Sequence, residues 1–380
     1  MSPTENQDNR PDGPGAGRIV VLDVLRAFAI LMMLQGHFVD TMLDPLYRDL
    51  ANPVYAGWNF MRGVTAPVFF FVSGMVFVFL LLRESRPWWQ SERIRKGLRR
   101  AALLLLLGYI LKWNFIWLIW SRTFYPSNFT VDVFQVLGLS LLAAIALVVL
   151  CRSLRLPLPL AFAALALAAF LAAPDIRAHD WSALPVFLQN YLVRTHGSTF
   201  TLFPWVGFAL FGGAAGWCLH TRPGLVSSRW TPVLLLLTGM AMHFQLDDAV
   251  GTYQAWTGSG PPALLIGVTG PLWRLGHVFI VLAIFIWIVR SAGAIPPLVT
   301  RIGRETLTIY SVHYVVLYGT WFGVGIATLG RGTWPPWAVV IGAAMFLAGF
   351  VYLIHRIDEI RAILRRAWRQ LWRRSGQTAA

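Results

Sequence analysis

Residues 18–40, RIVVLDVLRAFAILMMLQGHFVD, form the stretch of sequence that decides the fold. The stretch is long and apolar enough to cross a bilayer, because about 20 helical residues span the hydrocarbon layer. It nevertheless contains Asp23, Arg26, His37 and Asp40. Charged side chains inside a membrane segment are costly and rarely face lipid. We therefore expect a membrane-spanning helix whose polar side chains face other parts of the protein.

The composition of the whole chain supports a membrane protein. Of the 380 residues, 57% are hydrophobic and 13% are charged, whereas soluble domains carry about 25% charged residues. The formal net charge of +15 would suggest a nucleic-acid partner in a soluble protein, but the apolar background favours a lipid bilayer and no nucleic acid. A soluble enzyme is nearly excluded, and the chain is predicted to be an all-α integral membrane protein.

Ten apolar segments follow one another when hydropathy is averaged over about 19 residues. At about 20 residues per helix, they predict about ten transmembrane helices in one bundle. The expected spans are residues 19–43, 64–82, 101–120, 131–150, 158–173, 203–219, 233–245, 263–290, 304–325 and 337–354.

The distribution of basic residues predicts the orientation of this bundle. Twenty-three of the 32 Lys and Arg residues fall in tails and loops on one side of the expected spans, and six fall on the other side. Cytoplasmic loops carry the excess of Lys and Arg, so both termini are expected in the cytoplasm. We expect a multi-pass protein of the cell membrane, either a plasma or an inner membrane.

The two ends of the chain are predicted to be cytoplasmic tails. Residues 1–18 are polar and rich in Gly and Pro, which predicts a disordered tail before the polytopic membrane domain of residues 19–354. Residues 355–380 carry apolar side chains at helical spacing with arginines between them. This pattern predicts a basic amphipathic helix on the anionic cytoplasmic leaflet. An ordinary solvated basic tail is the alternative.

The polar residues of the first span share one face of the expected helix. At 100° per residue, Arg26 and His37 are three turns plus about 20° apart, and Asp23 lies within about 40° of His37. Asp23 can neutralise Arg26, and Asp40 can contact His37, because each pair is three residues apart. About 16 Å separates Arg26 from His37 along the helix axis.

Two interpretations fit this polar stripe equally well. In the first, Arg26 near the cytoplasmic face holds an anionic, phosphate-bearing ligand, and the imidazole of His37 handles protons near the far side. In the second, the stripe only packs the bundle, with the Asp23–Arg26 pair at a helix end and His37 hydrogen-bonded inside it.

Five motifs, in order along residues 18–320, resemble the transmembrane acyltransferases. DVLRAFAILMMLQGH is similar to the opening helix of the bacterial O-acetyltransferase branch, acyltransferase family 3, and TAPVFFFVSGMVF to the Phe-Phe and Ser-Gly element of the same families. FQVLGLS around Gln135 and FTLFPWVGFALFGGAAG around Pro204 resemble the related heparan-alpha-glucosaminide N-acetyltransferase branch. IGRETLTIYSVHYVVLYG resembles the late helix of these proteins and contains Tyr310 and His313.

This resemblance implies that acyl-CoA, with acetyl-CoA favoured, enters from the cytoplasm and that an extracytoplasmic carbohydrate or related acceptor is modified. His37 would take the acceptor proton as general base, Asp40 would orient it, and Arg26 would bind CoA phosphates. The chain departs from the family twice. Ala27 replaces the usual Gly, and residues 38–82 contain no His, although the N-acetyltransferase branch keeps its key His there. The catalytic role therefore falls on His37.

Two further basic positions in the expected spans have both a functional and a structural interpretation. Lys112 could bind donor phosphates, or it could extend its ammonium group to the membrane interface. Arg274 and His277 are three residues apart in the eighth expected span and face one side of it. Arg274 could be a further donor contact, or it could pair with Glu305 or Asp132.

The remaining candidates would support substrate binding. Asp132 and Gln135, at the outer end of the fourth expected span, could reach the acceptor or simply mark the interface. Ser73 precedes a Gly and is better explained by close helix packing than as a nucleophile, because no G-x-S-x-G element surrounds it. His313 could be a second acid–base group or a core residue bonded to Tyr310.

No metal site is expected, because Cys151 and Cys218 lie outside any C-x-x-C motif and no His or Asp cluster has ligand spacing. The sequence thus predicts an integral membrane acyltransferase. The alternative is a transporter or flippase for a glycan or lipid intermediate, in which the intramembrane charges line a path without chemistry. The sequence assigns neither the acceptor nor the oligomeric state.

Overall fold

The structure, a computed structural model, describes residues 19–84, 86–122, 126–259 and 263–377. These residues form helices, turns and loops, and no strand occurs among them beyond an isolated bridge between Leu43 and Trp334. The predicted all-α fold is therefore confirmed. The predicted tail of residues 1–18 lies outside the described residues.

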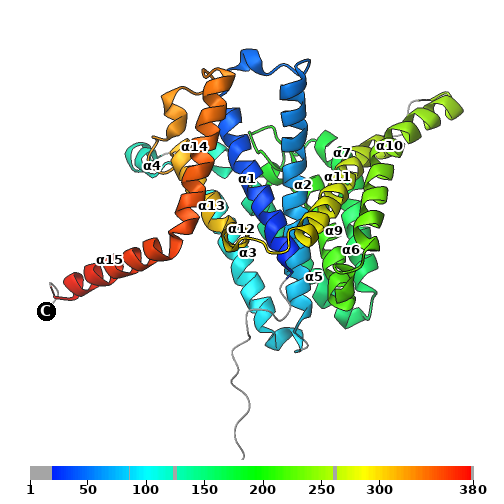
Figure 1. The fold of residues 1–380 in the computed structure, drawn as a ribbon, viewed down its shortest axis with the longest axis horizontal. Helices are drawn as coiled ribbons and strands as arrows, with labels where there is room; N and C mark the ends of the chain where they lie inside the picture. Colours follow the sequence, from blue (N-terminus) through cyan, green and yellow to red (C-terminus); the bar gives the residue numbers. More distant parts are fainter. Residues whose placement is uncertain (1–18, 85, 123–125, 260–262, 378–380) are drawn as a thin grey trace, which may run out of the picture.

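Eight helices in the described part of the chain are long and apolar enough to cross a membrane, as predicted for a membrane protein (Figure 1). Short segments connect them, among them α8 (Val186–Leu192) and 3-10 turns at Pro45–Tyr47, Trp88–Gln90, Pro126–Phe129, Pro223–Leu225 and Ile326–Leu329. The eight are α1 (Val20–Met42), α2 (Pro53–Leu82), α5 (Val133–Leu154), α6 (Leu158–Leu171) with α7 (Ala173–Ala178), α9 (Leu202–Thr221), α10 (Trp230–Thr257), α11 (Ala263–Ser291) and α14 (Pro336–His355).

The expected span at 101–120 is divided between two helices. It is shared by α3 (Glu92–Ile110) and α4 (Phe115–Ser121). Asn114 starts the second helix, because its Oδ1 accepts a hydrogen bond of 3.0 Å from the backbone N–H of Trp117. The break leaves Lys112 in a turn between the two helices.

The expected span at 304–325 is also interrupted. It comprises the end of α12 (Pro297–Arg304), α13 (Thr306–His313) and a π-helical turn at Tyr314–Tyr318. Non-helical backbone at membrane depth is tolerated where protein encloses it, and π-helical turns occur often at functional sites. The side chains beside both interruptions are therefore candidates for a functional site.

Helix α1 lies at the centre of the bundle, between α14 and α2 in Figure 1. It also packs against α11, α12 and α13. Its side chains Leu25, Ile30, Leu34 and Met42 are at most 1% exposed. The helix that carries the polar stripe is therefore enclosed by protein, as its charges require.

Glycines allow α2 and α9 to cross in close contact. A Cβ atom added at Gly74 would lie 1.9 Å from the carbonyl oxygen of Ala209, and one added at Gly212 would lie 1.9 Å from that of Phe71. Small residues of this kind let membrane helices approach through their backbones. The packing interpretation of Ser73 agrees with this crossing, because Ser73 adjoins Gly74.

Helix α15 (Ile357–Gln377) follows α14 and leaves the bundle at a steep angle (Figure 1). Arg361 donates to both carboxylate oxygens of Glu305 at 2.8 and 2.6 Å, and Arg301 pairs with Asp358, so ion pairs join the start of α15 to the α12–α13 segment. The predicted helix in residues 355–380 is thus present over Ile357–Gln377. Its position on a leaflet stays a prediction.

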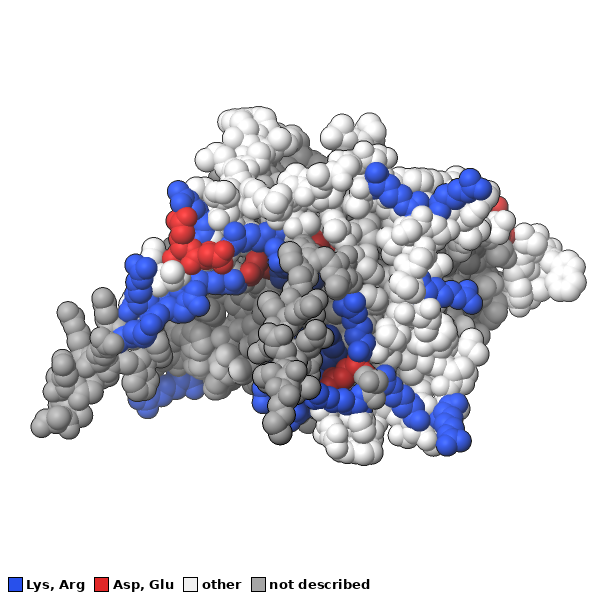
Figure 2. Space-filling view, turned by 60° about the horizontal axis from the view of Figure 1, so that its bottom comes forward, with Lys and Arg blue, Asp and Glu red and all other residues white. Residues whose placement is uncertain are grey.

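Basic side chains gather on the face of the molecule at which α2 ends and α3 and α15 begin. Figure 2 shows Lys and Arg side chains spread over this face, with a few Asp and Glu side chains between them. The loop charges predict that this side faces the cytoplasm.

We predict that Gly212→Val destabilises the protein, because the added side chain must push α9 away from the backbone of α2 at Phe71. Overpacking of this kind costs about 1–3 kcal/mol. The measurement is thermal unfolding of the purified protein in detergent. Gly349→Val on α14 is the matched control, because a Cβ at Gly349 meets nothing within 4 Å. Equal melting temperatures for the two variants would contradict the close crossing.

Candidate active site

Asp132 precedes α5 and caps its first turn. Its Oδ1 accepts a hydrogen bond of 2.8 Å from the backbone N–H of Val133, while the Gln135 Oε1 accepts one of 3.1 Å from the backbone N–H of Asp132. This reciprocal capping box satisfies donors that a helix start leaves open. Asp132 and Gln135 are both buried, and these backbone contacts stabilise the start of α5. The second carboxylate oxygen of Asp132, Oδ2, is left to bind other side chains.

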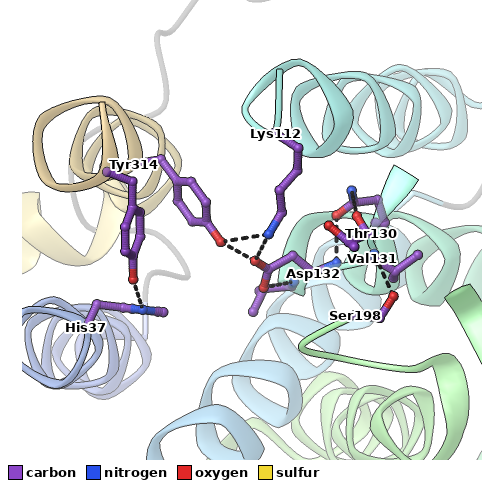
Figure 3. A network of polar contacts seen from close by, with 10 residues as sticks. His37, Lys112, Thr130, Val131, Asp132, Ser198 and Tyr314 are labelled. Atoms are coloured by element: carbon purple, nitrogen blue, oxygen red, sulfur yellow. Dashed lines mark hydrogen bonds and ion pairs between the residues drawn. The ribbon is translucent and has the colours of Figure 1, made fainter. Parts of the chain in front are cut away.

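Lys112 and Tyr314 bind that second oxygen. The Lys112 Nζ lies 2.8 Å from the Asp132 Oδ2 and 3.3 Å from the Tyr314 hydroxyl, and the Tyr314 hydroxyl donates to the same Oδ2 (Figure 3). The side chains of Lys112 and Asp132 are 17% and 5% exposed. Lys112 thus neither extends to the interface nor offers an unpaired ammonium to donor phosphates. The interpretation in which Lys112 extends to the membrane interface is therefore wrong, and its binding of donor phosphates stays a prediction.

His37 contacts the π-helical turn that also carries Tyr314. The His37 Nδ1 lies 2.8 Å from the Tyr318 hydroxyl, and the His37 ring lies 5.2 Å from that of His313. Tyr310 packs its ring 4.1 Å from Phe134 and stacks 5.3 Å from Tyr314. Side chains from α1, α5, α13 and the π-helical turn therefore meet at one place.

His313 is completely buried, and neither of its ring nitrogens has a hydrogen-bond partner among the described residues. Its ring packs 4.9 Å from both Tyr310 and Tyr314. Among the described residues, the Tyr310 hydroxyl therefore does not bind the His313 ring, although the two rings are in contact.

Tyr314 and Tyr318 are absent from the site residues predicted from the sequence. A signal for both was present, because Tyr310, Tyr314 and Tyr318 recur every four residues beside His313, and residues four apart lie on one side of a helix. Their partners, Asp132 and His37, belong to other helices and could not be read from this spacing.

A cavity of about 320 Å³ adjoins His37. Its wall includes Tyr310 and a group of aromatic side chains, and its polar lining comes from five different segments of the chain. The titratable side chains that line it are His37, Asp40, Arg62, Arg194, Arg274 and Tyr310.

Asp40 does not orient His37 as predicted. Its carboxylate forms an ion pair with Arg62 of α2, while the His37 Nδ1 contacts Tyr318. The side chain of Arg62 packs over Gly36, one residue before His37. Asp40 therefore fixes Arg62 in the cavity wall, and the hydroxyl of Tyr318 fixes the imidazole ring.

Arg274 is part of the cavity wall, away from the structural partners considered for it. Glu305 pairs with Arg361, and Asp132 pairs with Lys112. Neighbouring His277 does not share the site, since its Nε2 lies 3.1 Å from the Nδ1 of His243 and it does not line the cavity.

Arg194, in the loop between α8 and α9, also lines the cavity. Burial lowers the pKa of its guanidinium, and the positive charges of Arg177 and Arg274 lower it further. The two cavity arginines are therefore close enough to repel each other.

Arg26 belongs to the other end of α1. Its Nη2 donates to the Thr306 Oγ1 at 3.1 Å, and it does not line the cavity. The backbone carbonyl of Asp23 packs closely against Gly303 of α12. The separation of Arg26 from His37 along one helix is thus as the sequence predicted, while Ser73 does not line the cavity.

The described residues contain no group of three His, Cys, Asp or Glu side chains that could hold a metal ion. The polar groups near His37 are instead one imidazole pair, three tyrosines and charged side chains.

The family described as heparan-alpha-glucosaminide N-acetyltransferase, catalytic, matches residues 18–243, which is more than half of the chain. The chain belongs to this family. A search among curated proteins found no match. Members of the family are acetyltransferases. The protein is therefore an enzyme of the class that transfers acyl groups other than aminoacyl groups. The match includes α1 and all of α5, and it ends before Arg274 and the tyrosines of the π-helical turn.

We predict that Lys112→Met destabilises the protein strongly, because it leaves the buried Asp132 carboxylate without its cation. Removing one partner of a buried ion pair costs about 3–5 kcal/mol. Thermal unfolding in detergent measures the effect. The double variant Lys112→Met/Asp132→Asn serves as the control and should recover part of the loss. A single variant as stable as the wild type would show that the pair does not hold this region together.

Proposed function

We propose that the protein transfers an acetyl group from acetyl-CoA to an amine or hydroxyl of a carbohydrate acceptor in the His37 cavity. The observation that carries this proposal is a histidine, held by Tyr318 and lining a cavity of about 320 Å³, in a chain of an acetyltransferase family. In this proposal acyl-CoA is the donor substrate and enters from the cytoplasm, and the acceptor is extracytoplasmic.

His37 acts as the general base. When its Nδ1–H donates to the Tyr318 hydroxyl oxygen, the Nε2 lone pair is available to a substrate in the cavity. The Nε2 takes the proton of the acceptor as its oxygen or nitrogen attacks the thioester carbonyl. The bond from carbonyl carbon to sulfur breaks, and the CoA thiolate receives the proton from His37. The products are the acetylated acceptor and CoA.

The donor approaches from the opposite end of α1. Arg26 lies about 16 Å from His37 along the helix, and the positive charge of Arg100 is close enough to act on it. CoA carries its thioester at the end of a long pantetheine arm, so its phosphates bind at Arg26 while the acetyl group reaches His37. Both chain termini are on the donor side, in the cytoplasm, in agreement with the loop charges.

We predict that His37→Ala abolishes acetyl transfer while the protein still inserts into the membrane at normal abundance. General base catalysis contributes about 10²–10⁴-fold to a rate, so CoA release from acetyl-CoA with an acceptor should fall at least a hundredfold. Tyr318→Phe keeps the ring but removes the hydroxyl that holds the imidazole, and should cause a smaller loss.

His355→Ala, at the exposed end of α14, is the control for this experiment. Undiminished product from His37→Ala would remove His37 from the mechanism. A wild-type protein that neither binds acetyl-CoA nor releases CoA would favour transport without chemistry.

We predict that Arg26→Ala raises the KM for acetyl-CoA at least tenfold with a smaller effect on kcat, because a hydrogen bond to a charged group contributes about 1.5–3 kcal/mol. Steady-state kinetics in detergent measures both constants. Arg95→Ala, an exposed arginine of α3, is the matched control. An unaltered donor affinity in Arg26→Ala would exclude Arg26 from the donor site.

A further inference from the structure

A groove outside the His37 cavity lies along α1 between α2 and α14, the two helices that flank α1 in Figure 1. Its volume is about 610 Å³, within the range of about 300–1,000 Å³ that is usual for ligand sites. Val54 of α2 and Val340 of α14 line the groove and are 80% and 68% exposed. The groove is therefore open to the surroundings of the bundle.

The walls of the groove belong to membrane-spanning helices. Helices α1, α2 and α14 are each long and apolar enough to cross a membrane, and the α14 wall extends from Pro336 to Leu347. That stretch of helix rises about 16 Å, and half of a hydrocarbon layer of about 30 Å is about 15 Å thick. The groove therefore has the length of one lipid leaflet, and the medium around it at this depth is hydrocarbon.

One end of the groove is polar. Its lining side chains Tyr47, Asp49 and Asn52 come from the loop that joins α1 to α2. This loop lies beside the start of α14, because the backbone N–H of Asp44 donates to the carbonyl oxygen of Trp334 at 3.1 Å. Tyrosines of this kind are typical of the interface between lipid and water. The groove thus combines an apolar body with a polar end, as a phospholipid does.

The polar end carries one charge among the described lining residues, the exposed carboxylate of Asp49. Its Oδ1 accepts a hydrogen bond of 2.8 Å from the backbone N–H of Ala51, and no ion pair joins Asp49 to another described residue. A carboxylate without a cation attracts an ammonium group and repels an anion. The aromatic ring of Tyr47, at the same end, also favours a cation. An ammonium-bearing headgroup therefore fits this end better than an anionic one.

We propose that the groove binds one hydrocarbon chain of a phospholipid whose headgroup carries an ammonium ion, with that ion beside Asp49. The chain lies along α1 and contacts Val339, Ala343 and Leu347 of α14, which line the groove. The headgroup lies at the loop between α1 and α2. The lipid belongs to the leaflet at the His37 end of α1.

A contact between α1 and α2 separates this groove from the His37 cavity. The Trp58 Nε1 donates a hydrogen bond of 2.8 Å to the Gln35 Oε1, and both side chains line the groove. The guanidinium of Arg62, which lines the cavity, lies 5.8 Å from the centre of the Trp58 ring. Among the described residues, none lines both spaces. The lipid site therefore does not depend on the proposed function.

Photocrosslinking locates the lipid. The probe is phosphatidylethanolamine with a diazirine in one chain, added to the purified full-length protein in detergent. Labelled peptides should include the groove walls at residues 54–58 and 336–347. Ala344→Trp should lower this labelling at least tenfold, because Ala344 lines the groove at an exposed position and the indole takes the space of several methylenes.

Ala348→Trp is the matched control for this experiment. Ala348 is exposed one turn further along α14 and does not line the groove. The control should be labelled like the wild type, and melting temperatures check that each variant is folded. Equal labelling of the wild type and Ala344→Trp overturns the inference. Labelling that avoids the groove walls overturns it as well.

Native mass spectrometry tests the headgroup with phosphatidylethanolamine and phosphatidylglycerol of identical chains. The wild type should bind phosphatidylethanolamine at least threefold more tightly, a modest ratio because exposed ion pairs are weak. Asp49→Asn keeps an oxygen for the Ala51 N–H and should bring the ratio close to one. Asp180→Asn is the control, because the Asp180 Oδ1 accepts the same kind of bond from the Ser182 N–H in another exposed loop.

Equal affinities of the wild type for the two lipids contradict the proposal, and so does a preference that survives in Asp49→Asn. The same spectra report the oligomeric state. A dimer that Ala344→Trp dissociates without any loss of bound lipid would show that a second copy of the chain occupies the groove, and the inference would then be wrong.

Discussion

The buried carboxylate of Asp132 is the group on which the polar interior depends. A carboxylate at this depth needs a cation and hydrogen-bond donors, because a buried charge without partners is very costly. Lys112 and Tyr314 provide them, from a turn after α3 and from the π-helical turn after α13. Both segments are interruptions in expected spans. The helix breaks therefore place the two side chains that stabilise the buried carboxylate of Asp132.

This arrangement connects directly to His37. Tyr314 and Tyr318 belong to the same π-helical turn, and one binds Asp132 while the other binds the imidazole. Fixing the turn against α5 therefore also fixes the hydroxyl that holds His37. Close crossings at Gly74 and Gly212 bring α2 and α9, which both contribute to the cavity wall, into backbone contact.

Positive charge is divided among three places with different physical roles. The larger part covers the face shown in Figure 2, which the loop arginines predict to face the cytoplasm. Arg26 lies along α1 from His37, and Arg194 and Arg274 lie in the cavity wall. In the proposed reaction, Arg26 binds the donor phosphates. The donor and the acceptor would then meet at the imidazole of His37.

The sequence by itself determined the all-α membrane class, most of the spans and the polar stripe of α1, because hydropathy and helical periodicity are local properties of the chain. The motifs along residues 18–320 also carried the resemblance to transmembrane acyltransferases, and the match over residues 18–243 bears out its heparan-alpha-glucosaminide N-acetyltransferase branch. Only the tertiary structure decided that Lys112 pairs with Asp132, that Tyr318 rather than Asp40 holds His37, and that Arg194 joins Arg274 in one cavity. These partners are separated by 20 to 281 positions where hydrogen bonds join them. Their meeting depends on where helices break and how closely they cross, which no single segment encodes.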